Sequence, residues 1–183
     1  VIADIAASTG GKLDAVLVTH EHMDHVNGFA KKDPITKKPY FDPISIESLW
    51  LAWTEKPDDP DAIKLRERFN DTLLALAGTD AKLGEANHAI GSSRRQSLRR
   101  LLAFETGDEG GDGKASAADG LLHSLAKIRR DNPSLSFGEQ ATLAIDGITN
   151  KRAIKSLREK LGDRKPTYLN PGKETYSLNG VEG

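Results

Sequence analysis

The chain contains no cysteine among its 183 residues. Disulfide bonds and thiolate metal sites are therefore excluded, and any bound metal must be held by nitrogen and oxygen. No apolar run approaches the roughly 20 residues needed to cross a bilayer. A formal net charge of −1 gives no general attraction to nucleic acid or to an anionic membrane. With 37% hydrophobic and 29% charged residues, we expect a soluble, cytoplasmic globular domain, with or without an insertion.

Histidine is also scarce, with five residues in the chain, yet three of the five fall within seven positions. His20, His22 and His25 share this stretch with Asp24, directly after the apolar run 13–18. That run is short and rich in valine and leucine, which predicts a buried strand. Because side chains i and i+2 point to the same face of an extended chain, His20 and His22 are expected to project together.

The residues that follow predict how this cluster closes. Residues 26–32 can start a helix, and the turn before them would bring Asp24 and His25 back toward the first two histidines. Neutral imidazoles and a carboxylate that converge on one point are typical ligands of Zn²⁺. The helical zinc-protease motif H-E-x-x-H does not apply, because the position four residues after His20 is Asp24. The alternative is that the three histidines simply lie at a polar strand end and bind no metal. Their number and spacing argue against this alternative.

The segment Val16–Phe29 (VLVTHEHMDHVNGF) resembles the H-x-H-x-D-H signature of the metallo-β-lactamase superfamily. The resemblance implies an α/β fold, in which the motif lies between a core strand and a helix of an αβ/βα sandwich. It implies that His20 and His22 bind a first metal ion. It implies further that Asp24 and His25 bind a second one.

The activity that this resemblance implies is metal-dependent hydrolysis at a site with two zinc ions, although iron or manganese is compatible with the same ligands. A metal-bound hydroxide would attack the carbonyl or phosphorus centre of a small-molecule, ester or phosphoester substrate. Asp24 is the candidate catalytic residue, because it could orient the attacking water. Two alternatives stay open. One is an iron-dependent redox relative, and the other is a non-catalytic binding or scaffold module with a vestigial metal motif.

The chain departs from the family pattern in its later ligands. A complete site in this family takes two further histidines and a bridging aspartate from later loops. After His25 this chain offers only His88 and His123, both in segments with helical patterning. The chain also begins at Val1 without an initiator methionine. We interpret it as a piece of a longer protein that holds the first metal motif and is inactive by itself.

A loop is predicted over residues 31–45, because this segment contains three prolines and no periodicity. The loop leaves the helix that follows the candidate ligands, so Tyr40 or Phe41 could form a wall of the substrate pocket. The alternative is that these two aromatic side chains pin the loop to the core.

The remaining sequence predicts three parts. Residues 1–54 are the partial sandwich core with the metal motif, including a second core strand over 44–53. Residues 55–165 are a long helical insertion, and residues 166–183 are strands that return to the core. Helical periodicity indicates helices near 62–76, 92–104, 116–130 and 150–161, the last capped by Thr149 or Asn150. The insertion could cover the metal site and select the substrate, or form a homo-oligomer. Interleaved acidic residues make its arginines a poor nucleic-acid surface.

Overall fold

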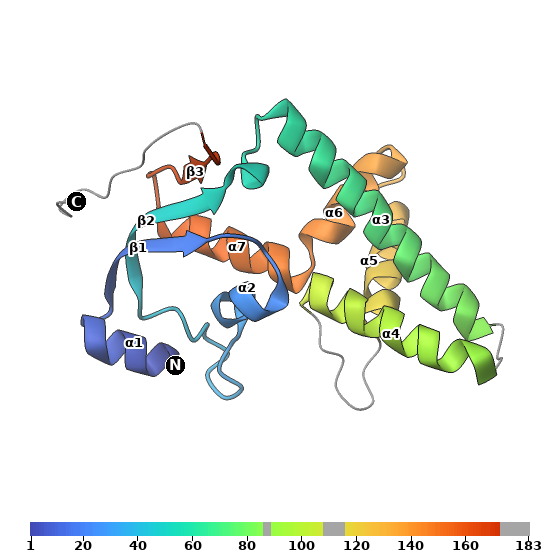
Figure 1. Cartoon of the computed structure of the whole chain (residues 1–183), viewed down its shortest axis with the longest axis horizontal. Coiled ribbons are helices and arrows are strands. Elements are labelled where there is room, and N and C mark those ends of the chain that lie inside the picture. Colours follow the sequence, from blue (N-terminus) through green and yellow to red (C-terminus); the bar gives the residue numbers. More distant parts are fainter. Residues whose placement is uncertain (86–88, 108–115, 173–183) are drawn as a thin grey trace.

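The computed structural model describes residues 1–85, 89–107 and 116–172, and the described residues form a mixed α/β fold (Figure 1). The α/β class expected from the sequence is therefore confirmed. The elements, in chain order, are α1 (Ile2–Thr9), β1 (Lys12–Val18), α2 (Met23–Ala30), β2 (Ser45–Ala52), the 3₁₀ helix η1 (Trp53–Glu55), α3 (Pro60–Glu85), α4 (Ala89–Thr106), α5 (Ala117–Asp131), α6 (Phe137–Asp146), α7 (Thr149–Lys160) and β3 (Thr167–Leu169).

The three strands form one parallel sheet in the order β1-β2-β3. In this register Val18 lies opposite Leu51, so the carboxyl ends of β1 and β2 reach the same edge of the sheet. In Figure 1 both arrows point toward the helices α3 and α4. Ligands of open parallel sheets bind outside the carboxyl ends of the strands. This edge is therefore where a functional site is expected.

β1 is less buried than the sequence predicted. Only Val18 of this strand is buried, and the side chain of Leu17 is 55% exposed. Within the described residues β1 pairs with β2 alone, so it is an edge strand of the sheet. The prediction of a buried strand was right about its conformation and wrong about its burial, because an apolar composition does not separate edge strands from central ones. β2 is the central strand, and its buried residues lie on both faces.

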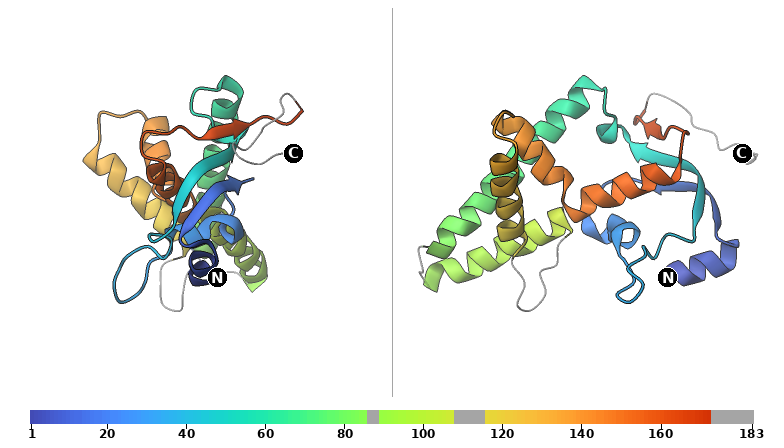
Figure 2. Two further views of the ribbon diagram at one scale, coloured as in Figure 1. Left: turned by 90° about the vertical axis from the view of Figure 1, so that its left-hand side faces the viewer. Right: turned by 180° about the vertical axis from the view of Figure 1, so that it is seen from behind.

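The sheet packs with α1, α2 and α7 into a first hydrophobic core, and we call these elements, together with β3, the sheet region. Its fully buried side chains include Val26 of α2, Leu51 of β2 and Leu157 of α7. Figure 2 shows α7 running along the sheet when the molecule is seen from behind. α7 lies within the stretch expected as an insertion, yet it supplies a large part of the core under the sheet.

The helices α3, α4, α5 and α6 form a second core, and we call them the helical region. Leu73, Leu102 and Ile145 are among its buried residues. Asp80 of α3 has none of its side-chain surface exposed and accepts hydrogen bonds from Arg95 and Arg99 of α4. This buried ion cluster joins the two long helices.

Several local predictions are settled by the described elements. The helix after the histidine motif begins at Met23, three residues earlier than expected. The helix α6 is not among those that the periodicity predicted. The last helix has Ile148 as its N-cap, so the predicted cap at Thr149 or Asn150 was wrong. Within the stretch 166–183, where returning strands are expected, β3 is described and residues 173–183 lie outside the described residues, as does His88. None of the described helices is both long and apolar enough to cross a membrane.

Candidate metal centre

The candidate ligands lie on the connection that leaves the carboxyl end of β1. β1 ends at Val18, and α2 begins at Met23 with His22 as its N-cap in extended conformation (φ −66°, ψ 153°). His20 therefore lies on the connecting loop. Asp24 and His25 lie in the first turn of α2, where the positive end of the helix dipole favours a carboxylate.

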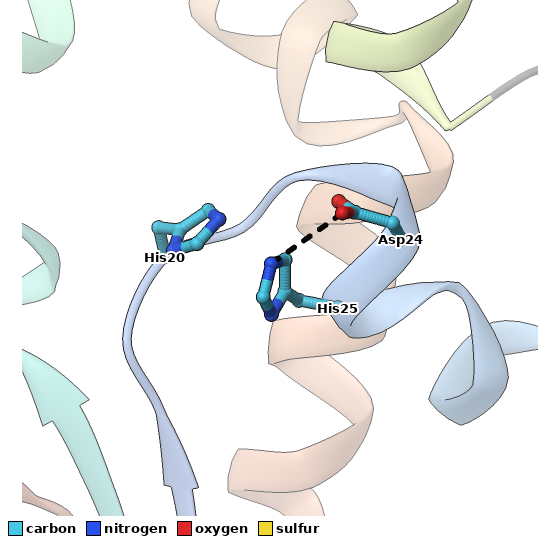
Figure 3. Close-up of side chains that lie close together, drawn as sticks. All are labelled: His20, Asp24 and His25. Carbon is cyan, nitrogen blue, oxygen red and sulfur yellow. Dashed lines mark ion pairs between the residues drawn. The ribbon is translucent and has the colours of Figure 1, made fainter.

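Three of the four residues predicted from sequence lie close together at this turn. Candidate ligand atoms of His20, Asp24 and His25 all lie within 4.8 Å of one another. The ring centroids of His20 and His25 are 4.0 Å apart. The Nε2 atom of His25 lies 3.5 Å from an Asp24 carboxylate oxygen, as drawn in Figure 3. All three residues are exposed, so an ion from solution can reach them.

The fourth predicted residue, His22, faces a different partner. Its ring lies edge-on to that of His20, with centroids 4.7 Å apart. Its Nε2 atom, however, lies 3.5 Å from a carboxylate oxygen of Glu105. The ring of Phe104 packs against the same imidazole, with the two ring centroids 4.7 Å apart. His22 therefore links the histidine cluster to the C-terminal end of α4.

The environment of His20 favours its neutral form. Loss of solvation beside its neighbours and the nearby His25 and His22 lower the pKa of His20, and the carboxylate of Asp24 only partly offsets them. The Nδ1 atom of His20 lies 2.9 Å from the Thr19 hydroxyl oxygen. A hydrogen bond at Nδ1 leaves Nε2 as the nitrogen for a metal ion, the arrangement common for histidine ligands.

The donor set is compatible with a metal ion. Imidazole nitrogens and a carboxylate suit zinc, iron and manganese. Two ligand atoms about 2.0 Å from a tetrahedral zinc ion lie about 3.3 Å apart. Asp24 and His25 come close to this spacing at 3.5 Å, and the whole group with His20 lies within 4.8 Å, so side-chain rotations would have to draw the three ligand atoms together.

A cavity of about 200 Å³ adjoins the histidines. His20, Glu21 and His22 line one side of it, and Glu55, Glu105 and Lys151 are among the residues that line the rest. The Nζ atom of Lys151 lies 2.6 Å from Glu21 and 3.9 Å from Glu55. Burial raises the pKa of Glu21; Lys151 lowers it, whereas the nearby carboxylates Glu55 and Glu105 raise it further. Lys151 thus lies between Glu21 and Glu55 beside the candidate ligands, and Glu55 also pairs with Arg158 at 3.6 Å.

Sequence reasoning missed Glu55, Glu105 and Lys151. Glu55 follows the carboxyl end of β2, and that position alone could have marked it, because strand ends of a parallel sheet meet at one edge. Glu105 and Lys151 lie on helices far from the motif in sequence, so no local pattern identifies them.

The weaker candidates of the sequence lie elsewhere. Phe41 is buried in the core under the sheet, with its ring edge-on to that of Phe29 at 4.8 Å. Tyr40 is exposed, and neither residue is among those that line the cavity beside His20. The alternative that Phe41 pins the loop to the core therefore describes its place in the structure. His123 is exposed on α5 and does not belong to the group of His20, Asp24 and His25.

No protein-family model, curated protein sequence or solved structure matches this chain significantly. The comparisons therefore neither support nor contradict the resemblance to metallo-β-lactamases noted for the H-x-H-x-D-H residues.

Proposed function

We propose that this chain carries the first metal-binding motif of a metal-dependent hydrolase. The observation that carries the proposal is the convergence of His20, Asp24 and His25 at the carboxyl edge of a parallel sheet. The position of the motif between β1 and α2 agrees with its place in the metallo-β-lactamase superfamily. We infer that the small parallel sheet belongs to an αβ/βα sandwich.

Each residue has a definite task in this proposal. His20, His22 and His25 bind the metal through neutral imidazole nitrogens, and Asp24 contributes a carboxylate oxygen. Bound zinc would lower the pKa of water and so supply a nucleophile near neutral pH. The exposed carboxylate of Asp24 can also accept a hydrogen bond from that water and orient it. The cavity beside Glu21 and Lys151 would receive part of a small ester, thioester or phosphoester substrate.

The test is a zinc titration of the purified chain against a competing chelator, with metal content measured after dialysis. We expect the wild-type chain to bind zinc, and the His20→Ala/His25→Ala double variant to bind it at least about tenfold more weakly. His123→Ala is the matched control, because it removes an exposed histidine on α5 and should leave the affinity unchanged.

The same measurement separates the alternatives. Iron in the purified chain, with redox-sensitive absorption, would favour the redox relative. A chain that binds no metal, or whose double variant binds zinc as tightly as the wild type, would overturn the hydrolase proposal and favour a binding or scaffold module.

A further inference from the structure

Glu105 is placed at the candidate metal centre by the helical region. It lies in the last turn of α4, and its side chain is 17% exposed. Its carboxylate oxygen lies 3.5 Å from His22 Nε2, and it lines the same cavity as His20 and Glu21. A carboxylate that is mostly withdrawn from water needs a positive or hydrogen-bonding partner. His22 is the partner that the structure gives it, on a motif already expected to bind metal.

The backbone around Glu105 is held firmly. Asn150 of α7 is fully buried, and its side-chain amide donates hydrogen bonds to the carbonyl oxygens of Phe104 (3.2 Å) and Glu105 (2.9 Å). Gly107, two residues after Glu105, has φ +74°, and a Cβ atom there would collide with the Asn150 side chain. The end of α4 is thus fixed against the start of α7, and sites on such rigid elements hold their geometry best.

We propose that Glu105 is a metal ligand that acts together with His22 and completes part of the coordination sphere from within this chain. This inference rests on the proposed function. The separation of 3.5 Å between Glu105 and His22 is close to the distance of about 3.3 Å between two ligands of one tetrahedral zinc ion. His20, whose ring contacts His22, links this pair to Asp24 and His25.

A purely structural role for Glu105 predicts something different. Glu105 would then only hold the His22 ring through a hydrogen bond, and a neutral amide would serve nearly as well. Glu105→Gln keeps the size and the hydrogen-bonding oxygen but loses the anionic ligand. This substitution therefore separates a ligand from a positioning residue.

The experiment compares zinc affinity and the visible absorption spectrum of the Co²⁺ complex in wild-type chain, Glu105→Gln and Glu105→Asp. We expect Glu105→Gln to weaken zinc binding about tenfold or more and to change the Co²⁺ bands, because water replaces a carboxylate. Glu105→Asp should recover part of the affinity. Glu159→Gln, an exposed glutamate on α7, is the matched control and should resemble wild type. Circular dichroism checks that each variant is folded.

The outcomes distinguish this inference from the proposed function. Wild-type affinity and an unchanged Co²⁺ spectrum in Glu105→Gln would overturn the ligand role of Glu105. If the His20→Ala/His25→Ala variant still lost zinc, the proposed function would stand without it. Zinc binding that needs Glu105 but not His20 and His25 would support the inference and overturn the donor set proposed above.

Discussion

The helical region and the sheet region begin their helices in different ways. α5 and α6 each start with a serine, Ser116 or Ser136, in a complete capping box. The helices of the sheet region begin without a side-chain cap, and α2 has His22 at that position. A serine there would satisfy a free backbone N–H group of the first turn. The sheet region thus gives up local helix stability at the point where its candidate ligands lie.

The two regions also differ in how completely their buried carboxylates are paired. In the helical region, Asp80 is paired by two arginines. At the edge of the sheet, Glu21 keeps one buried oxygen without a hydrogen-bond partner in the described part of the chain. Its neighbours Glu55 and Glu105 add negative charge, and the nearby cations are divided, with Lys151 2.6 Å from Glu21 and Arg158 3.6 Å from Glu55. An incompletely compensated site is typical of function, whereas a fully paired one is typical of structure.

The largest expected effect comes from truncating a core leucine in either region. Leu157→Ala should lower the free energy of unfolding by about 3 kcal/mol, and Leu102→Ala by a similar amount, because both side chains are fully buried. Hydrogen exchange would locate the damage. We expect Leu157→Ala to reduce protection in α2 and β2, and Leu102→Ala to reduce it in α3 and α5. Equal loss everywhere from either variant would contradict two separable cores.

Asp80→Asn should have the next largest effect and should be confined to the helical region. Burial opposes ionisation of Asp80, but hydrogen bonds and charges from Arg95 and Arg99 outweigh it and lower the pKa below its usual value of 3.8. A carboxyl group with a lowered pKa adds stability above about pH 4, and this stability is lost as the pH falls through the folded-state pKa. We expect Asp80→Asn to cost about 2 kcal/mol at pH 7, since the arginines can still reach water.

Urea denaturation at pH 7 and at pH 3 checks this expectation. The wild-type chain should lose stability between the two values, and the part due to Asp80 should vanish in the variant. Zinc affinity at pH 7 should not change, because Asp80 lies outside the candidate metal centre. A variant as acid-sensitive as the wild type would show that the ion cluster contributes little.

Asn150→Ala tests the joint between the two regions. The substitution removes hydrogen bonds to the carbonyl groups of Phe104 and Glu105, which should lower the free energy of unfolding by about 1–2 kcal/mol. Asn132→Ala is the control, because Asn132 also donates to a carbonyl group, that of Ile128, but within the helical region. Only Asn150→Ala should also weaken zinc binding, measured by titration. An equal effect of both variants on zinc would argue against Glu105 as a fixed ligand.

Local patterns account for what the sequence predicted well. The helices α3 and α5 follow from apolar periodicity and capping residues, and β1 and β2 follow from short apolar runs. The position of the histidine motif after a strand is a local feature for the same reason. Each of these predictions depends on residues within one or two turns of each other.

The misses have a common physical cause in contacts between distant residues. The sequence favours Asn150 as a helix cap. In the structure its side-chain amide donates hydrogen bonds to carbonyl groups about 45 positions earlier, and Ile148 is the N-cap residue. The apolar composition of β1 predicts a buried strand, but its burial depends on how many strands flank it in the sheet. Glu105 carries no signal of its own, since it becomes a candidate ligand only when α4 packs beside α2.

The smallest effect on stability is expected where the comparison began, at the cap of α2. Ser136→Ala in the helical region should lower the free energy of unfolding by about 1 kcal/mol. His22→Ser places a capping side chain on α2 but loses the packing of the imidazole on Phe104, so stability should stay within about 0.5 kcal/mol of wild type. Zinc affinity should nevertheless fall about tenfold or more, because a ligand is gone. Urea denaturation and zinc titration measure the two quantities separately. Unchanged zinc affinity would mean that His22 serves the helix and its neighbours rather than a metal ion.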